Sequence, residues 1–433
     1  MSPHQGMLQA ASAIQPAPDV REALAARYTA VRRRSATLSE PLAPDDYGLQ
    51  AKPEVSPAKW HLAHTSWFFE TFLLKSLLPD YRPFHPLFEH LFNSYYEQIG
   101  APFPRPQRGL LSRPTTEEIF RYRAHVDEAM TGLIASAGAP RWPELAARVH
   151  LGCHHEEQHQ ELFLMDIKYN FALNPLRPAY RADLPAPVTQ ALVPTAWIEQ
   201  AGGFQEIGYN GNGFAFDNET PRHRAWLGSY ALSSRLVTNS EYLEFINAGG
   251  YQRPEYWLAD GWHSAREQKW QAPLYWEKID GRWWIFTLAG MRELNLHEPV
   301  CHVSFYEAEA YARWTGKRLP SENEWETIAQ RNPIRGNLLE AGRLHPVPAA
   351  GKENTQIFGD VWEWTGSPYA SYPGYRPAAG ALGEYNGKFM VNQLVLRGGS
   401  CVTPTDHIRA SYRNFFYPAD RWQFSGIRLA DDR

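Results

Sequence analysis

Apolar and polar positions in the first 173 residues alternate with the period of an α-helix over four long segments. Each segment begins at a side chain suited to cap a helix or at a proline suited to its first turn. The predicted helices run from Asp19 to about residue 38, from Ser56 and Pro57 to about residue 78, from the capping box of Thr115 and Glu118 to about residue 135, and from Pro143 to about residue 171. Helices of this length predict an antiparallel four-helix bundle, in which facing side chains can form metal or cofactor sites.

The connection between the second and third predicted helices, residues 79–114, is too long for a simple turn in a bundle. Loops of this length in compact domains are usually functional or disordered. The many Phe and Tyr residues argue against disorder. We therefore expect this loop to pack near a functional site.

The pattern changes beyond residue 173. Residues 174–194 are rich in Pro and Ala, as a linker is, and the remainder is dominated by Gly, Trp, Tyr, Asn and short apolar runs. Helical periodicity there is evident mainly at residues 240–248 and 304–315. Of the 16 tryptophans, only three precede residue 190. The sequence predicts a multi-domain protein with a tail over 1–18, a helical bundle over 19–173, a linker over 174–194 and a loop-rich α+β domain over 195–433.

Composition narrows the class of function. The 433 residues include 43 basic and 47 acidic side chains and carry a net charge of -4, which disfavours a nucleic acid or an anionic membrane as partner. Apolar stretches are far shorter than the ~20 residues of a membrane helix, and the N-terminus lacks the apolar core of a secretory signal. Three widely spaced cysteines exclude a disulfide framework and favour the cytoplasm.

The strongest chemical signal is the segment HHEEQHQE at residues 154–161. His155 and His159 are four residues apart on a predicted helix, so both can reach one metal ion. Neutral imidazoles suit Fe, Zn, Ni or Cu. Glu161 points about 200° away from His159, and we expect it to orient a histidine from outside the ligand set. The competing interpretation is a polar helix face with surface histidines.

A third ligand is expected from the second predicted helix, which offers His61 and His64. On this helix His64 shares a stripe with Trp60 and Trp67, and His61 lies about 60° off it. The helical pattern leaves both histidines open as ligands. Glu156 with His159 also has the spacing of a di-iron site, but no second such pair occurs in the N-terminal half, so a mononuclear site is favoured.

These histidine motifs and a series of motifs in the C-terminal half resemble the ergothioneine-biosynthesis sulfoxide synthases. That family joins a DinB-like four-helix bundle to a domain like the formylglycine-generating enzymes, which has a C-type-lectin-like fold. The motifs are KWHLAHT at 59–65, HEEQHQE at 155–161, DNETPRH at 217–223, VTNSEY at 237–242, PVCHVSFYEA at 299–308, RLPSENEWE at 318–326, GDVWEW at 359–364, RGGS at 397–400 and GIRL at 426–429.

The resemblance implies a mononuclear non-haem Fe(II) held by three histidines, and it selects His64 over His61 to join His155 and His159. It implies an O2-dependent reaction that joins a thiol to the imidazole C2 of hercynine (Nα-trimethylhistidine) and forms a sulfoxide. Three neutral ligands leave three positions of an octahedron for thiolate, imidazole and dioxygen, which fits this chemistry. We expect Trp60 and Trp67 to pack beside the iron.

The resemblance also implies residues that contact substrate. Gln158 matches a family position that hydrogen-bonds the substrate imidazole. Asn414 is a candidate for the amino-acid end of hercynine. Phe415 and Phe416 are candidates for packing on the quaternary ammonium, which is attracted to aromatic faces; core packing is the competing role.

An active-site tyrosine supplies a proton in this family, from the C-terminal domain in some members and from the long loop in others. A phenol can donate a proton without being charged at neutral pH. The loop in this chain contains Tyr95 and Tyr96, and we expect at least one of them to act in this way. The competing role is a tyrosine pair that holds the loop in place.

The thiol is expected to be cysteine in preference to γ-glutamylcysteine. Members that use γ-glutamylcysteine have an acidic residue at the position of Phe416, which cannot bind a substrate ammonium by charge. Arg105 and Arg108 are candidates for the thiol's carboxylate. Action on protein cysteines is not expected, because Cys401 has no partner cysteine at residues 410–411.

Three other functions fit parts of the sequence. One is a DinB-type thiol transferase with zinc or nickel, which would not consume oxygen. The second is the histidine–cysteine sulfoxide synthase of ovothiol biosynthesis, whose members usually carry a methyltransferase after the lectin-like domain; it is not expected for a sequence that ends at Arg433. The third is a ligand-binding module with structural histidines and no turnover.

Overall fold

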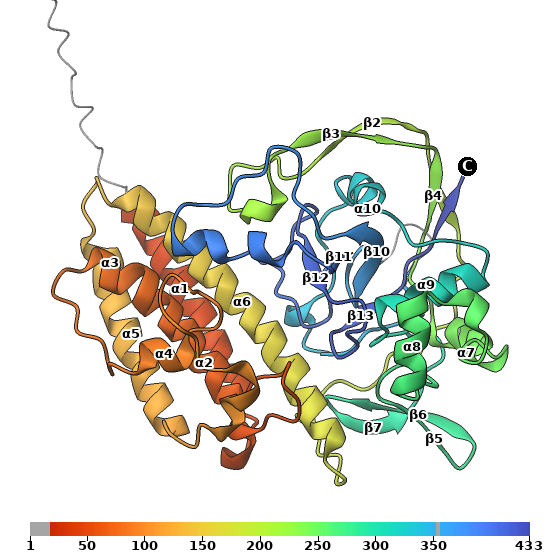
Figure 1. Ribbon diagram of the computed structural model, residues 1–433, viewed down its shortest axis with the longest axis horizontal. Helices are drawn as coiled ribbons and strands as arrows, with labels where there is room; N and C mark the ends of the chain where they lie inside the picture. Colours follow the sequence, from red (N-terminus) through yellow and green to blue (C-terminus); the bar gives the residue numbers. More distant parts are fainter. Residues whose placement is uncertain (1–17, 352–355) are drawn as a thin grey trace, which may run out of the picture.

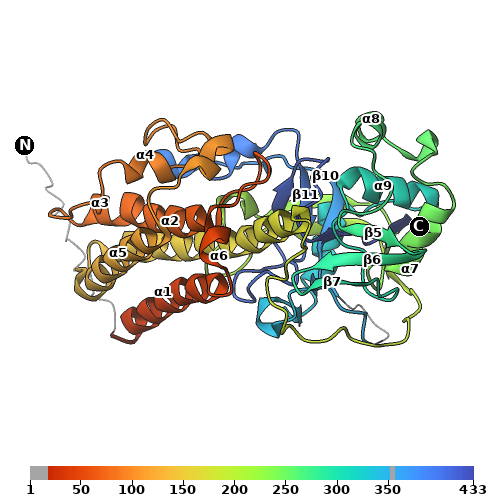
Figure 2. The same cartoon turned by 90° about the horizontal axis from the view of Figure 1, so that it is seen from below.

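The computed structural model describes residues 18–351 and 356–433 (Figure 1). All but the last residue of the predicted tail lies outside this part. The bundle lies on one side of the molecule and the α+β region on the other, and α6 runs between them (Figures 1 and 2). No helix among the described residues combines the length and apolar character needed to cross a membrane.

Four long helices form the bundle: α1 (Pro18–Ser39), α2 (Ala58–Phe69), α5 (Thr116–Ser136) and α6 (Trp142–Leu173). Helix α1 packs on α5 and α6, and α2 packs on the same two helices. The α2 helix continues through a π-helical turn, Glu70–Leu74, into the short α3 (Lys75–Leu77). Single π-helical turns of this kind are frequent near functional sites.

The helix starts follow the predicted signals closely. Thr115 caps α5, and its hydroxyl accepts from Glu118 N at 3.2 Å, so the predicted capping box is confirmed. The other three starts differ slightly. Asp19, expected to cap α1, lies inside its first turn. Pro57 is the cap residue of α2 instead of its first residue, and α6 begins at Trp142, one residue before Pro143. Both prolines still stand where a helix has no partner for a backbone N–H.

The long loop between α3 and α5 packs on α2. It contains α4 (Phe88–Phe92) and a 3₁₀ helix, Arg105–Leu110. Trp60 and Trp67 of α2 donate their indole N–H groups to the carbonyls of Leu91 at 3.2 Å and Glu89 at 3.0 Å. The loop thus packs against the helix that carries His61 and His64, and the functional site that it was expected to border stays a prediction.

The C-terminal region is built from small sheets, with strand orders β1-β4-β14, β12-β11-β10-β13, β5-β6-β7, β2-β3 and β8-β9. The strands are β1 (Trp197–Gln200), β2 (Gly203–Ile207), β3 (His223–Leu227), β4 (Tyr230–Ser233), β5 (Trp276–Ile279), β6 (Arg282–Thr287), β7 (Gly290–Glu293), β8 (Gly336–Asn337), β9 (Phe358–Gly359), β10 (Trp362–Pro368), β11 (Leu394–Arg397), β12 (Asn414–Phe416), β13 (Ser425–Gly426) and β14 (Ala430–Asp432).

Four helices accompany these sheets: α7 (Asn239–Asn247), α8 (Ala259–Glu267), α9 (Phe305–Trp314) and α10 (Glu322–Ala329). The two predicted from periodicity correspond to α7 and α9. Helices α8, of nine residues, and α10, of eight residues, were missed from the sequence. A capping box of Ser321 and Glu324 marks the start of α10.

Tryptophans form much of the C-terminal core, as predicted. Trp325, Trp362 and Trp364 are at most 1% exposed. The indole of Trp325 donates to Glu363 at 2.7 Å, and that of Trp364 donates to the Val303 carbonyl at 2.9 Å. A buried indole needs such an acceptor. Trp362 differs from the other two, because the acceptor of its indole hydrogen bond lies on α6.

Candidate active site

The α6 segment from His154 to Glu161 directs its side chains in three ways, because a helix turns by about 100° per residue. His155 and His159 face α2. Glu156 enters the bundle core. The third group, His154, Glu157 and Glu161, contacts the C-terminal region. A single short stretch of helix therefore serves the histidine cluster, the bundle and the domain interface.

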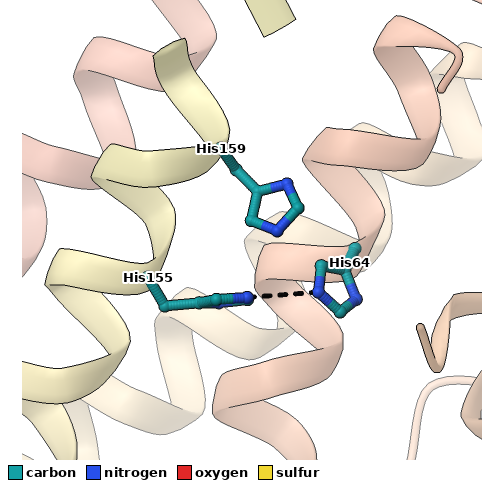
Figure 3. A group of neighbouring side chains, drawn as sticks. All are labelled: His64, His155 and His159. Atoms are coloured by element: carbon teal, nitrogen blue, oxygen red, sulfur yellow. Dashed lines mark hydrogen bonds between the residues drawn. The ribbon is translucent and has the colours of Figure 1, made fainter. Parts of the chain in front are cut away.

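His64 on α2 and His155 and His159 on α6 point toward one another (Figure 3). One ring nitrogen from each lies within 4.8 Å of the other two. The Nε2 atoms of His64 and His155 are 3.2 Å apart. The structure thus brings together the three residues predicted as metal ligands, whereas His61 lies beside the cluster with a different role.

Hydrogen bonds set the orientation of two of these rings. Nδ1 of His64 lies 2.6 Å from the Phe92 carbonyl, so it carries the hydrogen and Nε2 keeps its lone pair. Nδ1 of His159 lies 2.9 Å from Nδ1 of His61, whose Nε2 lies 3.0 Å from an oxygen of Asp166. The carboxylate accepts from His61, and His61 accepts from His159, which leaves Nε2 of His159 unprotonated. Such outer partners commonly orient metal-binding histidines.

Burial keeps the cluster neutral. It lowers the pKa of His155 to about 3, and it lowers the pKa of His64 and His159 well below the ordinary histidine value, with a further contribution from the neighbouring imidazoles. Nδ1 of His155 is buried and has no hydrogen-bond partner among the described residues. Neutral imidazoles are the form that binds metal ions. The cluster can therefore hold a metal ion without first losing protons at neutral pH.

Two tryptophans form walls beside His64. The Trp60 ring stacks on it with centroids 4.6 Å apart and planes 12° apart, and the Trp67 ring does so at 5.3 Å and 16°. The predicted stripe of Trp60, His64 and Trp67 is thus one stack of rings. These indoles exclude water from one side of the cluster and limit rotation of the imidazole.

Glu156 is held by arginines in the bundle core. Arg32 and Arg123 each lie 2.9 Å from one of its two oxygens. Burial by itself raises the pKa of Glu156, but the two guanidinium groups outweigh it and bring the pKa to about 2. A carboxylate used in this way is not a metal ligand, which agrees with the preference for a mononuclear site.

Glu161 does not orient a histidine, so that prediction was wrong. Its carboxylate accepts from Trp362 at 2.6 Å, and from two hydroxyls of the C-terminal region, Ser400 at 2.9 Å and Thr403 at 2.7 Å. The angle between Glu161 and His159 around the helix correctly excluded direct ligation. That angle could not show that a second domain would fill the space on the far side of α6.

Gln158 lies at the domain interface, between two tyrosines of the C-terminal region. Its amide nitrogen lies 2.7 Å from the Tyr412 hydroxyl, and its amide oxygen accepts from the Tyr385 hydroxyl. The Tyr385 ring centroid is 5.7 Å from that of His155. Tyr385 was missed from the sequence, because no motif surrounds it and only the fold brings it to the cluster.

Tyr385 also borders a cleft of about 550 Å³ between α6 and loops of the C-terminal region. His150 and Leu151 line it from α6, and Phe214 and Phe216 line it from the opposite side. The Phe216 ring stacks on Tyr385 with centroids 5.4 Å apart. The cleft therefore gives access from outside to one edge of the ring whose hydroxyl contacts Gln158.

Tyr95 and Tyr96 lie next to each other behind the tryptophan stack. Their rings stack at 4.6 Å, and their hydroxyl oxygens are 3.5 Å apart. The Tyr96 ring contacts Trp67 at 5.5 Å, and the Tyr95 ring contacts Phe389 at 4.9 Å. Burial raises the pKa of Tyr95 to about 12 and raises the pKa of Tyr96 well above its usual value. Both are phenols at neutral pH.

The two candidate arginines differ in position. Arg108 is 3% exposed, and its guanidinium carbon lies 3.4 Å from the centroid of the Trp60 ring. Its Nε atom has no partner among the described residues. Arg105 is exposed and donates to the backbone carbonyl of Glu54. Only Arg108 is thus adjacent to the wall of the cluster.

Strand β12 carries the remaining predicted contacts. In its pairing with β11, Asn414 and Phe416 lie opposite Leu396 and Leu394, and Phe415 lies between them. Side chains alternate along a strand, so Phe415 faces the other side from Asn414 and Phe416. The Phe415 ring stacks on Tyr369 at 4.0 Å, and the Phe416 ring contacts Trp422 at 5.8 Å. The two rings thus lie on opposite faces of β12, and the contact of either ring with a quaternary ammonium stays a prediction.

Comparison with known proteins agrees with this two-part structure. Residues 27–163 match the DinB superfamily, and residues 183–343 and 345–433 match the sulfatase-modifying factor enzyme 1-like domain. A helical bundle of the first kind joined to a domain of the second defines the class of this protein, and it confirms the predicted fold class.

Two relatives that span most of the chain define the family. Hercynine oxygenase of Mycolicibacterium smegmatis is 31% identical over 444 residues, which cover 95% of this chain and 99% of that protein. Hercynine oxygenase of Mycolicibacterium thermoresistibile is 32% identical over 418 residues, covering 88% of this chain and 89% of its own. Formylglycine-generating enzyme of Streptomyces coelicolor is 28% identical over 317 residues, which cover 59% of this chain and 95% of that protein. The chain belongs to the hercynine oxygenase family.

Proposed function

We propose that this protein is an Fe(II)- and O2-dependent enzyme of ergothioneine biosynthesis that joins a thiol sulfur to the imidazole C2 of hercynine and oxidises the sulfur to a sulfoxide. The observation that carries the proposal is the cluster of His64, His155 and His159, in a chain that matches hercynine oxygenases along nearly its whole length. The free and buried cysteines suit a reducing compartment, and we place the enzyme in the cytoplasm.

The donor set supports iron as the metal. Three neutral nitrogen ligands leave open positions for other groups, as a catalytic site requires. Two Nε2 atoms 3.2 Å apart, with one ring nitrogen of each of the three histidines within 4.8 Å of the other two, fit a site that is completed by a cation. When bound, iron would supply a Lewis acid for the thiol and the redox chemistry for dioxygen.

The chain's own residues would align the substrates. Gln158, held between two tyrosines, would hydrogen-bond the imidazole of hercynine. Asn414 and Phe416 share one face of β12, and we assign them to the amino-acid end of hercynine and to its quaternary ammonium. Phe415 would support them through Tyr369. An aromatic face attracts a quaternary ammonium without a competing charge.

A phenol would supply the proton that the reaction needs. Tyr95 and Tyr96 remain candidates, and Tyr385 is a third. Burial raises the pKa of Tyr385 well above its ordinary value, so its hydroxyl hydrogen is retained at neutral pH. Of the three, Tyr385 is the one whose hydroxyl contacts Gln158 and whose ring contacts His155, so we favour it.

Cysteine is the favoured thiol. Arg108, buried on the face of Trp60, would bind the carboxylate of cysteine, because a buried guanidinium with an unused donor favours an anion. Arg105 would contribute only if it left the Glu54 carbonyl. Phe416 offers no negative charge to the ammonium on the glutamyl group of γ-glutamylcysteine.

Oxygen uptake by anaerobically prepared Fe(II) protein tests the proposal. Each pairing of cysteine or γ-glutamylcysteine with histidine or hercynine is supplied in turn, and products are identified by mass spectrometry. We expect rapid uptake and a sulfoxide product with cysteine plus hercynine. Full iron loading without a coupled product from any pair would refute it. Thiol transfer with zinc and no oxygen uptake would favour a DinB-type transferase instead, and coupling to unmethylated histidine would favour the ovothiol-type synthase.

A further inference from the structure

The domain interface beside the histidine cluster contains a chain of polar side chains that leads to Gln158, and its other members have no role in the function proposed above. It starts at Glu157 of α6, passes through His407 and Tyr412 of the C-terminal region, and returns to α6 at Gln158. Glu157, His407 and Tyr412 are at most 3% exposed. The chain thus crosses the interface twice between two neighbouring residues of one helix.

Glu157 is the charged end of this chain. Arg27 lies 3.0 Å from Oε2 of its carboxylate, and Arg34 lies 3.5 Å from Oε1. Two guanidinium groups stabilise the ionised carboxylate, which can only accept hydrogen bonds. Nδ1 of His407 lies 3.4 Å from Oε2 of Glu157 and is hydrogen-bonded to Nδ1 of His154 at 3.0 Å.

His407 continues the chain of polar side chains through its other ring nitrogen. Nε2 of His407 lies 3.0 Å from the Tyr412 hydroxyl, within hydrogen-bond distance. The hydroxyl oxygen then accepts from the amide nitrogen of Gln158 at 2.7 Å, and the amide oxygen is turned toward Tyr385.

We propose that Glu157, His407 and Tyr412 are positioning residues that fix the orientation of the Gln158 amide, and thereby align the substrate imidazole only when the two domains are docked. The proposal rests on the proposed function for the assignment of the imidazole to Gln158. A glutamine amide has two similar ends, and a site that must distinguish the two nitrogens of an imidazole needs one fixed end.

A second metal ion at this place is the competing interpretation. Nδ1 of His154, Nδ1 of His407 and an oxygen of Glu157 lie 3.0 to 3.4 Å apart. However, Arg27 lies 3.0 Å from the same oxygen and 3.4 Å from Nε2 of His154. A divalent cation would be repelled by this guanidinium, and every nitrogen of the two imidazoles has a partner without a metal.

The substitution Tyr412→Phe tests the proposal, because it removes one hydroxyl and keeps the ring. The measurement is the dissociation constant of hercynine for the iron-loaded protein, by calorimetry without oxygen or thiol. We expect binding about tenfold weaker than in the wild type. With turnover, KM for hercynine is expected to rise while KM for cysteine is unchanged. The control is Thr403→Val, which removes a hydroxyl that bonds Glu161 at the same interface and lies outside the chain of polar side chains; its affinity for hercynine is expected to stay within about twofold of wild type.

A second pair of variants covers the case in which Tyr412→Phe does not fold. His407→Gln keeps a donor and an acceptor, whereas His407→Leu keeps neither, so affinity for hercynine is expected to fall in the order wild type, His407→Gln, His407→Leu. Equal affinity in the wild type and in Tyr412→Phe or His407→Leu would overturn this inference alone. Absence of hercynine binding to the wild type would overturn the proposed function and this inference with it. Elemental analysis showing two metal ions per chain, one of them lost in His407→Gln, would also overturn the inference.

Discussion

Three phenols are candidates for the proton donor, and their environments differ at the scale of single atoms. The Tyr385 hydroxyl contacts Gln158, whereas those of Tyr95 and Tyr96 contact each other. We expect Tyr385→Phe to reduce formation of the sulfoxide by about 10²- to 10⁴-fold, the usual range for loss of a general acid. Oxidation of the thiol alone is expected to increase under the proposed function, because the substitution leaves the histidine cluster unchanged. Product ratios under single-turnover conditions give the measurement.

Phenylalanine at Tyr95 and at Tyr96 provides the matched comparison. Each removes a buried hydroxyl from the same region without touching Gln158, so the product ratio is expected to stay near that of the wild type. A diversion to thiol oxidation in the Tyr95 and Tyr96 variants, with Tyr385→Phe unaffected, would assign the proton to the loop instead.

At the scale of helices, much of the bundle and of the cluster could be predicted from spacing. The capping box of Thr115 and the four-residue interval of His155 and His159 are local properties of the chain, and local properties survive folding. The π-helical turn after α2 gave no such signal. It places Glu70 where it accepts from Tyr81 at 2.6 Å and Tyr122 at 2.8 Å, so it depends on residues brought together by packing.

Close approach of α6 to α2 depends on Gly152. A Cβ atom there would lie 2.4 Å from the ring of Phe69, which is fully buried and cannot move aside. We expect Gly152→Ala to destabilise the protein by about 2 kcal/mol, since overpacking outweighs the better helix propensity of alanine. Metal affinity is also expected to fall, because a wider spacing separates His155 from His64. Denaturant unfolding and iron titration give the two measurements.

Gly132 of α5 is the control for that substitution. A Cβ atom at this position would meet nothing within 4 Å. Gly132→Ala is therefore expected to stabilise the protein by about 0.5–1 kcal/mol, as alanine does in an open helix. A gain in stability from both substitutions would show that α2 and α6 are not in tight contact at Gly152.

At the scale of the whole molecule, α6 is the element that joins the two halves. Glu161 docks into the C-terminal region, and Asp166 accepts from His61 and, at 3.2 Å, from the Trp422 indole. None of these contacts could be predicted from the sequence, because each depends on how two domains meet and not on the period of a helix. For the same reason, the sequence could not predict that Tyr385 lies beside the histidine cluster.

Lys168 of α6 also contacts the C-terminal region. Its side chain is fully buried, and its Nζ atom lies 2.8 Å from Nε2 of His302. Burial lowers its pKa to about 8 from about 10.5 in the unfolded chain. Between these values the unfolded chain holds a proton that the folded protein has lost, so stability rises with pH. Relative to Lys168→Met, the free energy of unfolding of the wild type is expected to rise by about 3 kcal/mol from pH 7.5 to pH 10.5. Chemical denaturation of both proteins across this range gives the difference in the free energy of unfolding. The control is Lys278→Met, which removes an exposed lysine and measures the part of the pH dependence that loss of any lysine would cause. A difference between wild type and Lys168→Met that does not change with pH would mean that the ammonium stays protonated in the core.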